Sequence, residues 1–201
     1  ITDATAAAAT WMATTVPTVK PADLVAKVRA LMPHSINVRR AVVTLAGGEF
    51  DFAETNGYEY NSETDTYTVY DADGLIKVVA EINAGNLDAN VVLVADIDLN
   101  GKAYTPIAPG DKNATVGYTG TFDGQGYAIK NFTSSQTTNG SNGPGAGFIQ
   151  LAGACTVKNV TFVNPVVEGV RGTAVVIAKT VGGEKTQTVT IENCNIINGK
   201  A

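Results

Sequence analysis

The chain has 201 residues, of which 44% are hydrophobic and 16% are charged, and its net charge at pH 7 is −5. This length and composition allow one large or two small domains with a real core, whereas the low content of basic residues argues against a nucleic-acid partner. No run of about 18 apolar residues is present, so the sequence predicts no membrane span.

The chain begins at Ile1, without a Met and without the pattern of a signal peptide. We therefore expect a processed or trimmed product. Low charge and a high content of Thr, Asn and Gly fit an exported protein, which we place outside the cell or on the cell surface. The same composition is typical of a β-rich fold with many turns.

Residues 1–70 predict a short lead-in followed by a small β-rich module. Residues 1–20 are rich in Ala and Thr and read as a linker or terminal strand. Residues 21–32 have apolar residues at helical spacing between two prolines, which predicts a short helix. Residues 36–45 and 49–53 are expected to be strands, and residues 58–70 a hairpin around a five-residue loop, 61–65. We assign residues 21–70 to the module.

A second helix is expected at about residues 73–84. Asp73 is placed to cap its N-terminus, and Gly85 is a suitable stop. One face is apolar, with Leu75, Val78, Val79 and Ile82. Because repeats follow at once, this helix is expected to cover their first coil, and residues 71–201 form one helix-capped domain.

Repeats dominate the rest of the chain. Four segments, starting at Val94, Ile129, Val157 and Ile191, share core positions n, n+3 and n+5, at spacings of 35, 28 and 34 residues. This period predicts a stack of similar coils with parallel strands over about residues 90–201. The last three segments carry Asn at n+2, where the chain is expected to bend. A short amide can bond the backbone groups left unpaired at a bend, so we expect a ladder of Asn131, Asn159 and Asn193.

The two cysteines are expected to stay free. Cys155 and Cys194 are about five residues out of register in the repeat frame, which is roughly 16 Å along a strand and too far for a disulfide. The last coil, which ends at Ala201, has no cap. We expect more coils to follow in the natural protein, or a partner or a second copy to cover this end.

The order of motifs resembles the lead-in of bacterial surface proteins that carry GLUG-motif repeats. The matching stretches are GLIKVVAEINAGN, VVLVADIDLNG, YTPIAPG and YTGTFDGQGYAIKNF, followed by the drifted repeats TVKNVTFVN and TIENCNIING. The resemblance covers about 125 residues. It implies a right-handed parallel β-helix-like solenoid on an exported, adhesin-like protein of the kind found in Bacteroidetes-type bacteria, and it assigns no ligand.

Several motifs could be mistaken for metal or phosphate sites. Asp96 and Asp98 could hold a metal, but strand alternation explains them better. The sequence at Asp71–Gly74 starts like a calcium loop and lacks the later ligands. Residues 123–126 lack the Lys-Ser/Thr pair of a phosphate loop. His34 is the only histidine, which excludes a multi-histidine metal site. We predict no metal, no cofactor and no catalytic residue.

An enzyme is the weaker alternative, because β-helix folds include polysaccharide lyases and hydrolases. Hydrolysis needs two carboxylates about 5 to 10 Å apart. Glu168 and Glu192 fall at different corners of neighbouring coils, and Arg171 has no acidic partner in register.

The sequence thus predicts a mainly β, non-enzymatic surface protein that binds glycans or proteins. Its best candidates for stacking on a sugar are Tyr104, Tyr118 and Tyr127, although exposed tyrosines are common on β surfaces. The second hypothesis is a structural spacer or a subunit of a fibre or surface appendage, since stacked coils are stiff.

Overall fold

The computed structural model describes residues 41–45, 48–52, 57–110, 114–136, 145–170, 172–181 and 187–200. It is mainly β and divides into two compact units, residues 1–55 and 56–201. In the first unit, the two strands expected at residues 36–45 and 49–53 correspond to β1 (Ala41–Leu45) and β2 (Gly48–Phe52), and they pair antiparallel. The expected lead-in 1–20 and helix 21–32 lie outside the described residues.

The second unit begins with a hairpin. Strands β3 (Tyr58–Asn61) and β4 (Thr66–Val69) pair antiparallel, and Asn61 lies opposite Thr66, so residues 62–65 form the loop. Strand β4 then pairs in parallel with β5 (Asn90–Leu93). The hairpin therefore belongs to the sheet of the repeats, and the compact unit begins near residue 56, whereas the sequence placed the boundary near residue 70.

Helix α3 (Ala72–Asn83) packs against β3, β4 and β6. Its predicted apolar face is confirmed, since Leu75, Val78, Val79 and Ile82 are all buried. The predicted cap is wrong: the Asp71 carboxylate accepts a hydrogen bond from Gly74 N at 2.8 Å, while Asp73 lies inside the first turn. Among the described residues, no helix is long and apolar enough to cross a bilayer.

Close backbone contact fixes the start of α3. A Cβ atom on Gly74 would collide with the carbonyl group of Gly57, which itself has a left-handed φ of +76°. Only glycine allows two backbones to approach this closely. The hairpin and the first helical turn can therefore pack this closely because residues 57 and 74 are both glycine.

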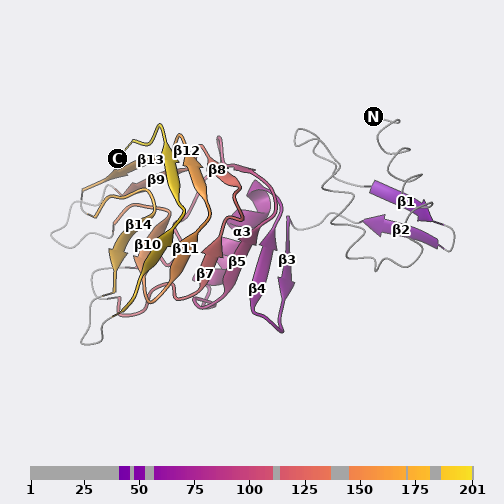
Figure 1. Cartoon of the computed structure of the whole chain (residues 1–201), viewed down its shortest axis with the longest axis horizontal. Helices are drawn as coiled ribbons and strands as arrows, with labels where there is room; N and C mark the ends of the chain where they lie inside the picture. The colour runs from indigo at the N-terminus through magenta and orange to yellow at the C-terminus, as the bar shows by residue number, and fades with distance from the viewer. Residues whose placement is uncertain are drawn as a thin grey trace. The chain divides into compact units, whose positions relative to one another are not determined.

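The remaining strands recur in a constant order (Figure 1). They are β6 (Ile97–Asp98), β7 (Thr121–Asp123), β8 (Ala128–Lys130), β9 (Thr133–Gln136), β10 (Ile149–Ala152), β11 (Thr156–Lys158), β12 (Thr161–Val163), β13 (Val166–Gly169), β14 (Ile177–Thr180), β15 (Thr190–Glu192) and β16 (Asn195–Ile197). They build a six-stranded sheet in the order β15-β11-β7-β5-β4-β3, a four-stranded sheet β16-β12-β8-β6, and the pairs β13-β9 and β10-β14. Apart from β3 with β4, every pairing in this unit is parallel.

The register confirms the alignment of the last two predicted segments and corrects the first two. Val157 pairs with Ile191, but Ile129 pairs with Phe162, and Phe122 occupies the position beside Val157. Ile129 follows Phe122 by seven positions, whereas Phe162 follows Val157 by five. The extra residues make the turn at Gly124–Gly126, and Ile129 therefore takes the n+5 position of its segment and not the predicted n position. Val94, predicted to be a core position, is 39% exposed.

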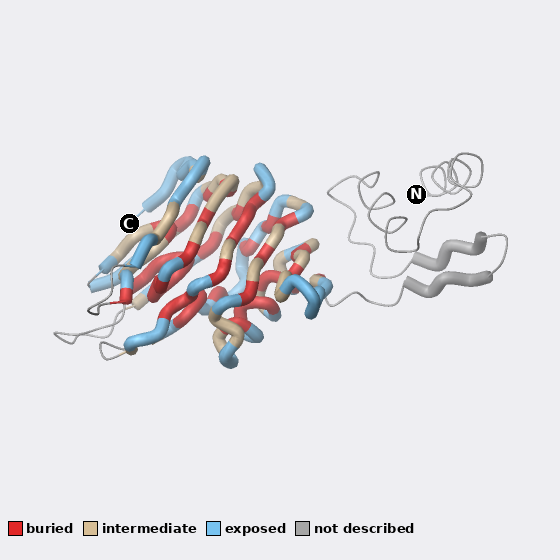
Figure 2. The backbone as a smooth tube through the Cα atoms, turned by 60° about the horizontal axis from the view of Figure 1, so that its bottom comes forward, coloured by how far each residue is buried: buried red, intermediate tan, exposed pale blue. Residues whose placement is uncertain are grey.

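Side chains from successive strands form continuous interior rows. One row runs through paired positions from one edge of the six-stranded sheet to the other: Tyr60, Tyr67, Val91, Phe122, Val157 and Ile191. At the centre of the core, the ring of Phe148 lies 5.0 to 5.7 Å from the rings of Tyr104, Phe122, Phe132 and Phe162. Figure 2 shows the resulting buried segments repeating from strand to strand. Edge-on and offset aromatic contacts of this kind stabilise a core beyond the area they bury.

Candidate functional site

Two rows of polar side chains follow the bends between sheets. In the first row, Asn159 Nδ2 donates to Asp123 Oδ1 at 3.0 Å, and Asn193 Nδ2 donates to Asn159 Oδ1 at 3.2 Å. The second row contains Asp98, Asn131, Asn164 and Asn198, joined by amide-to-oxygen bonds of 2.9, 3.1 and 3.3 Å. The bond between Asn159 and Asn193 matches the predicted ladder, but Asn131 is in the other row.

The backbone explains why asparagine fills these positions. All five Asn residues of the two rows have a left-handed φ, between +50° and +56°. Asparagine tolerates this conformation better than other side chains, and its amide both donates and accepts. Asn164 and Asn198 were missed at the sequence level. Their signal was the spacing of 33 and 34 residues from Asn131 through Asn164 to Asn198.

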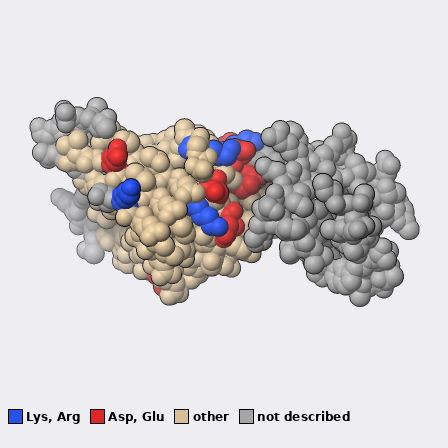
Figure 3. Space-filling model, turned by 90° about the horizontal axis from the view of Figure 1, so that it is seen from above, with Lys and Arg blue, Asp and Glu red and all other residues tan. Residues whose placement is uncertain are grey.

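The carboxylates near these bends form ion pairs with lysine side chains. Asp123 Oδ2 lies 3.3 Å from Lys158 Nζ, and Asp96 Oδ2 lies 2.8 Å from Lys130 Nζ. On the face of the molecule seen in Figure 3, acidic and basic side chains are intermixed. Burial raises the pKa of Asp123, but hydrogen bonds from Gln125 and Asn159 and the charge of Lys158 outweigh it, so the pKa is lowered overall. No cluster of three His, Cys, Asp or Glu residues that could hold a metal occurs in the described part of the chain.

The structure does not bring the three predicted tyrosines together at a surface. Tyr118 is fully buried and donates to Ala89 O at 2.9 Å, and Tyr104 is 8% exposed and donates to Phe148 O at 2.9 Å. Burial raises the pKa of both phenols, which stay neutral. Tyr127 is partly buried and packs against the core. The sequence could not show that residues 104 and 118, outside the predicted strands, fold inward and join the core.

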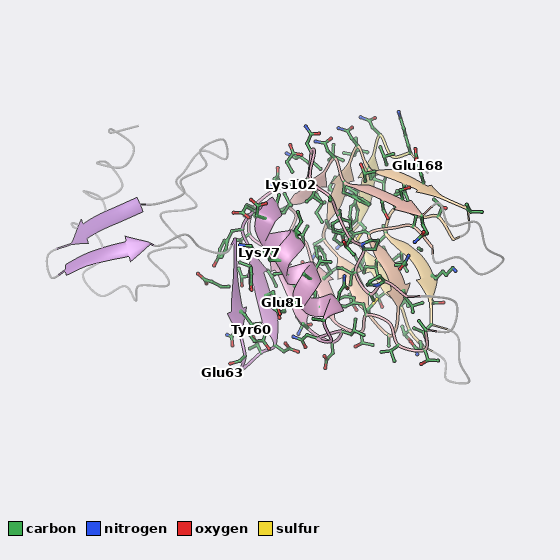
Figure 4. The ribbon with its side chains drawn as sticks, turned by 180° about the vertical axis from the view of Figure 1, so that it is seen from behind. Tyr60, Glu63, Lys77, Glu81, Lys102 and Glu168 are labelled. Carbon is green, nitrogen blue, oxygen red and sulfur yellow. The ribbon has the colours of Figure 1, made fainter. Side chains whose placement is uncertain are left out.

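The exposed tyrosine is Tyr60, on the edge strand β3 (Figure 4). Its side chain is 47% exposed, and its ring lies 4.6 Å from the ring of Tyr67 with a tilt of 33°. Its hydroxyl donates to Asp65 Oδ1 at 2.9 Å, and the same oxygen accepts from Asn86 Nδ2 at 3.0 Å. The hydrogen bond to the carboxylate raises the pKa of the Tyr60 phenol. An aromatic ring, a carboxylate and an amide thus meet at the hairpin, and we call Tyr60, Asp65 and Asn86 the hairpin cluster.

The hairpin cluster was missed at the sequence level. The Tyr-Glu-Tyr alternation of residues 58–60 predicted the strand, and it left open which face is buried. The position of Tyr60 at the sheet edge comes from the antiparallel pairing of β3 with β4, beyond which the described residues add no further strand.

A shallow groove of about 430 Å³ lies beside α3. Its lining is mainly apolar: Ile76, Val79, Ala80, Asn83, Ala84, Tyr104, Thr105 and Pro109. The Asn83 amide donates to Pro106 O and accepts from Ala108 N, so it holds the loop against the helix. Because its main polar side chain is engaged in this way, the groove offers little to orient a ligand.

The residues weighed for enzyme chemistry do not converge. Glu168 pairs with Ser135 between β13 and β9, whereas Glu192 pairs with Lys158 between β15 and β11, in another sheet. His34 and Arg171 lie outside the described residues. Both cysteines are free thiols, and burial raises the pKa of Cys155 to about 11 and also raises that of Cys194.

Comparison with known proteins identifies a similar fold. No protein family matches the sequence, and no curated protein does. Among solved structures, the chain is similar to a "putative immunoglobulin A1 protease" from Bacteroides ovatus, with a TM-score of 0.52 and 24% sequence identity. The match covers 71% of this chain and 39% of that one. At this identity the similarity concerns the fold.

Proposed function

We propose that this chain is part of an exported, non-enzymatic surface protein whose stacked strands form a β-helix-like solenoid and carry binding sites for glycans or proteins. The proposal includes an adhesin-like role. Its main support is the parallel register from β4 to β16, in which equivalent strands pair coil after coil. Such an arrangement buries a continuous core and leaves outer faces and loops for recognition.

The polar rows support this separation between residues that build the scaffold and residues that bind. The repeated Asn side chains bond to one another along the two rows, and the carboxylates Asp98 and Asp123 begin these rows. Side chains that form hydrogen bonds with one another at the bends serve to stabilise the scaffold. Binding then falls to residues outside the repeat pattern, such as those of the hairpin cluster.

The test is a screen of the folded chain against a glycan array and a panel of immobilised surface proteins. Saturable binding to one of these, absent with the heat-denatured chain, is the expected result. Absence of binding to both panels would contradict the proposal.

A second candidate function is a structural spacer or assembly subunit. Ile191, Ile196 and Ile197, on β15 and β16, are all about half exposed, which suits a surface that meets another copy or another coil. Self-association that rises with concentration, measured by analytical ultracentrifugation, together with no ligand in the screens, would favour this function.

An enzyme is the least supported function. Release of reducing sugar or unsaturated uronate from a polysaccharide panel would overturn the non-enzymatic proposal. The name of the Bacteroides ovatus protein adds one further assay, cleavage of immunoglobulin A1. The chain spans 39% of that protein, so a negative result is expected and only cleavage would change the proposal.

A further inference from the structure

We propose that the hairpin cluster is a binding subsite for a neutral pyranose sugar. This inference rests on the proposed function as a glycan-binding scaffold and names the site and the class of sugar. The argument starts from Tyr60, whose side chain is 47% exposed although it belongs to the same row as the interior residues Tyr67 and Val91.

One face of the Tyr60 ring is covered by Tyr67, and nearly half of the residue is exposed. Tyr67, directly opposite in the hairpin, packs against the ring with centroids 4.6 Å apart, and Tyr67 itself is buried. The exposed surface of Tyr60 is therefore a flat aromatic face on a rigid support. The C–H face of a pyranose packs on such a surface, and aromatic side chains lose little conformational freedom in doing so.

The polar groups needed to orient a sugar lie at the hydroxyl end of the ring. Tyr60 Oη and Asn86 Nδ2 both donate to Asp65 Oδ1, at 2.9 and 3.0 Å. Both bonds fall on one carboxylate oxygen, so Oδ2 of Asp65 is the acceptor that a hydroxyl of the stacked sugar would use. The Oδ1 atom of Asn86 provides a second acceptor, since its amide nitrogen is the atom engaged with Asp65.

The cluster is held in place before any ligand arrives. Asp65 has a left-handed φ of +46°, and its carbonyl oxygen accepts from Asn90 N at 2.8 Å, which ties the turn to β5. The Asn61 side chain accepts from the backbone of Glu63 and Thr64 and shapes the same turn. A site fixed in this way pays less conformational entropy on binding.

The negative charge of the hairpin favours uncharged sugars over acidic ones. Glu63 and Asp65 lie in the loop of this hairpin, next to Tyr60, and Glu63 is exposed (Figure 4). No Lys or Arg occurs between residues 57 and 76. Uronates and sialylated glycans would meet like charge here, so the site favours uncharged pyranosides.

The experiment is saturation-transfer NMR on the full chain with methyl glucoside, methyl galactoside, methyl mannoside and N-acetylglucosamine, with glucuronate as the charged probe. Tyr60→Ala removes the platform and should weaken binding of the preferred neutral sugar by about tenfold. Asp65→Asn keeps the shape and tolerates the left-handed turn, but it removes the charge; it should weaken neutral-sugar binding less and should reduce discrimination against glucuronate.

Tyr58→Phe is the matched control, because Tyr58 also packs on Tyr67 from the same strand but lies outside the cluster. It should bind like the wild type, and circular dichroism should show all three variants folded. If the wild type binds sugars and Tyr60→Ala binds equally well, this inference is wrong while the proposed function stands. Preference for glucuronate over every neutral sugar would also overturn it. Binding of no glycan and no protein by the wild type would remove the proposed function and this site together.

Discussion

The two ends of the repeat unit are finished in different ways. At the β3 end, α3 places Leu75, Val78 and Ile82 against the first strands, where they are buried completely. At the β15 end, Ile191 and Ile196 occupy the same interior rows and are 52% and 51% exposed. The same kind of side chain is therefore core at one end and surface at the other, and its position in the stack decides which.

The polar rows show the same asymmetry. Each begins with a carboxylate, Asp123 or Asp98, and its last described member is a neutral amide, Asn193 or Asn198. Ionisable groups within the rows are thus confined to the end near α3. Stability and its dependence on pH should differ between the ends, and matched substitutions can test this.

The largest difference is expected for isoleucine truncation. Ile82→Ala removes a fully buried side chain and should lower the free energy of unfolding by about 2 to 5 kcal/mol. Ile196→Ala, the matched change at the other end, should cost less than about 1 kcal/mol because half of that side chain is already in water. Urea unfolding of both variants measures the two values, and equal losses would mean that the β15 end is covered in solution.

Substitutions within the first polar row should have the next largest effect. Asn159→Ala removes both a donor and an acceptor of the row and should cost about 1 to 3 kcal/mol. Asn193→Ala removes one bond and should cost roughly 0.5 to 1.5 kcal/mol. Both residues have a left-handed φ, so the backbone penalty of alanine is shared and cancels in the comparison. Equal costs in thermal unfolding would show that the rows do not act as connected ladders.

Low pH should lower the stability of the repeat unit at its end near α3. The pKa of Asp123 is lowered in the folded state, so its contribution to stability is present above its ordinary pKa of about 3.8 and is lost as the pH falls below that value. Asp123→Asn keeps a row member of the same shape and should flatten this part of the pH profile. Denaturation midpoints between pH 2 and 6 provide the measurement, and an unchanged slope would assign the acid sensitivity to other carboxylates.

Thiol labelling of the two cysteines tests the same difference between the two ends, and it is expected to give the smallest effect. Cys155 is buried and its pKa is raised to about 11, so it should react with a thiol reagent only when the protein opens. Cys194, one coil nearer the β15 end and half-buried, should react first. Both should react at once in denaturant. Faster labelling of Cys155 would contradict the register.

The sequence predicted the secondary-structure elements better than it predicted how these elements pair and pack. The hairpin and α3 with its buried face follow from local patterns of apolar residues and turn residues, and the pairing of Val157 with Ile191 follows from the 34-residue spacing of two similar segments. The row containing Asn131 and the paired position of Ile129 were misplaced, because two extra residues in one turn hide that Ile129 is equivalent to Phe162, five residues beyond the predicted partner Val157. The candidate site was missed for a related reason. Tyr60 and Tyr118 look alike in sequence, and only pairing and packing make one exposed and the other buried.

By itself, the sequence determined a mainly β chain with similar segments spaced 28 to 35 residues apart, one amphipathic helix before them, and bends built around asparagine. These features depend on residues close together in the chain, where backbone preference and apolar periodicity act directly. The tertiary structure decided which coil each strand joins, which of two rows each asparagine enters, and which tyrosine reaches the surface. Those outcomes depend on contacts between residues some 30 positions apart, and a change of one or two residues in a turn is enough to alter them.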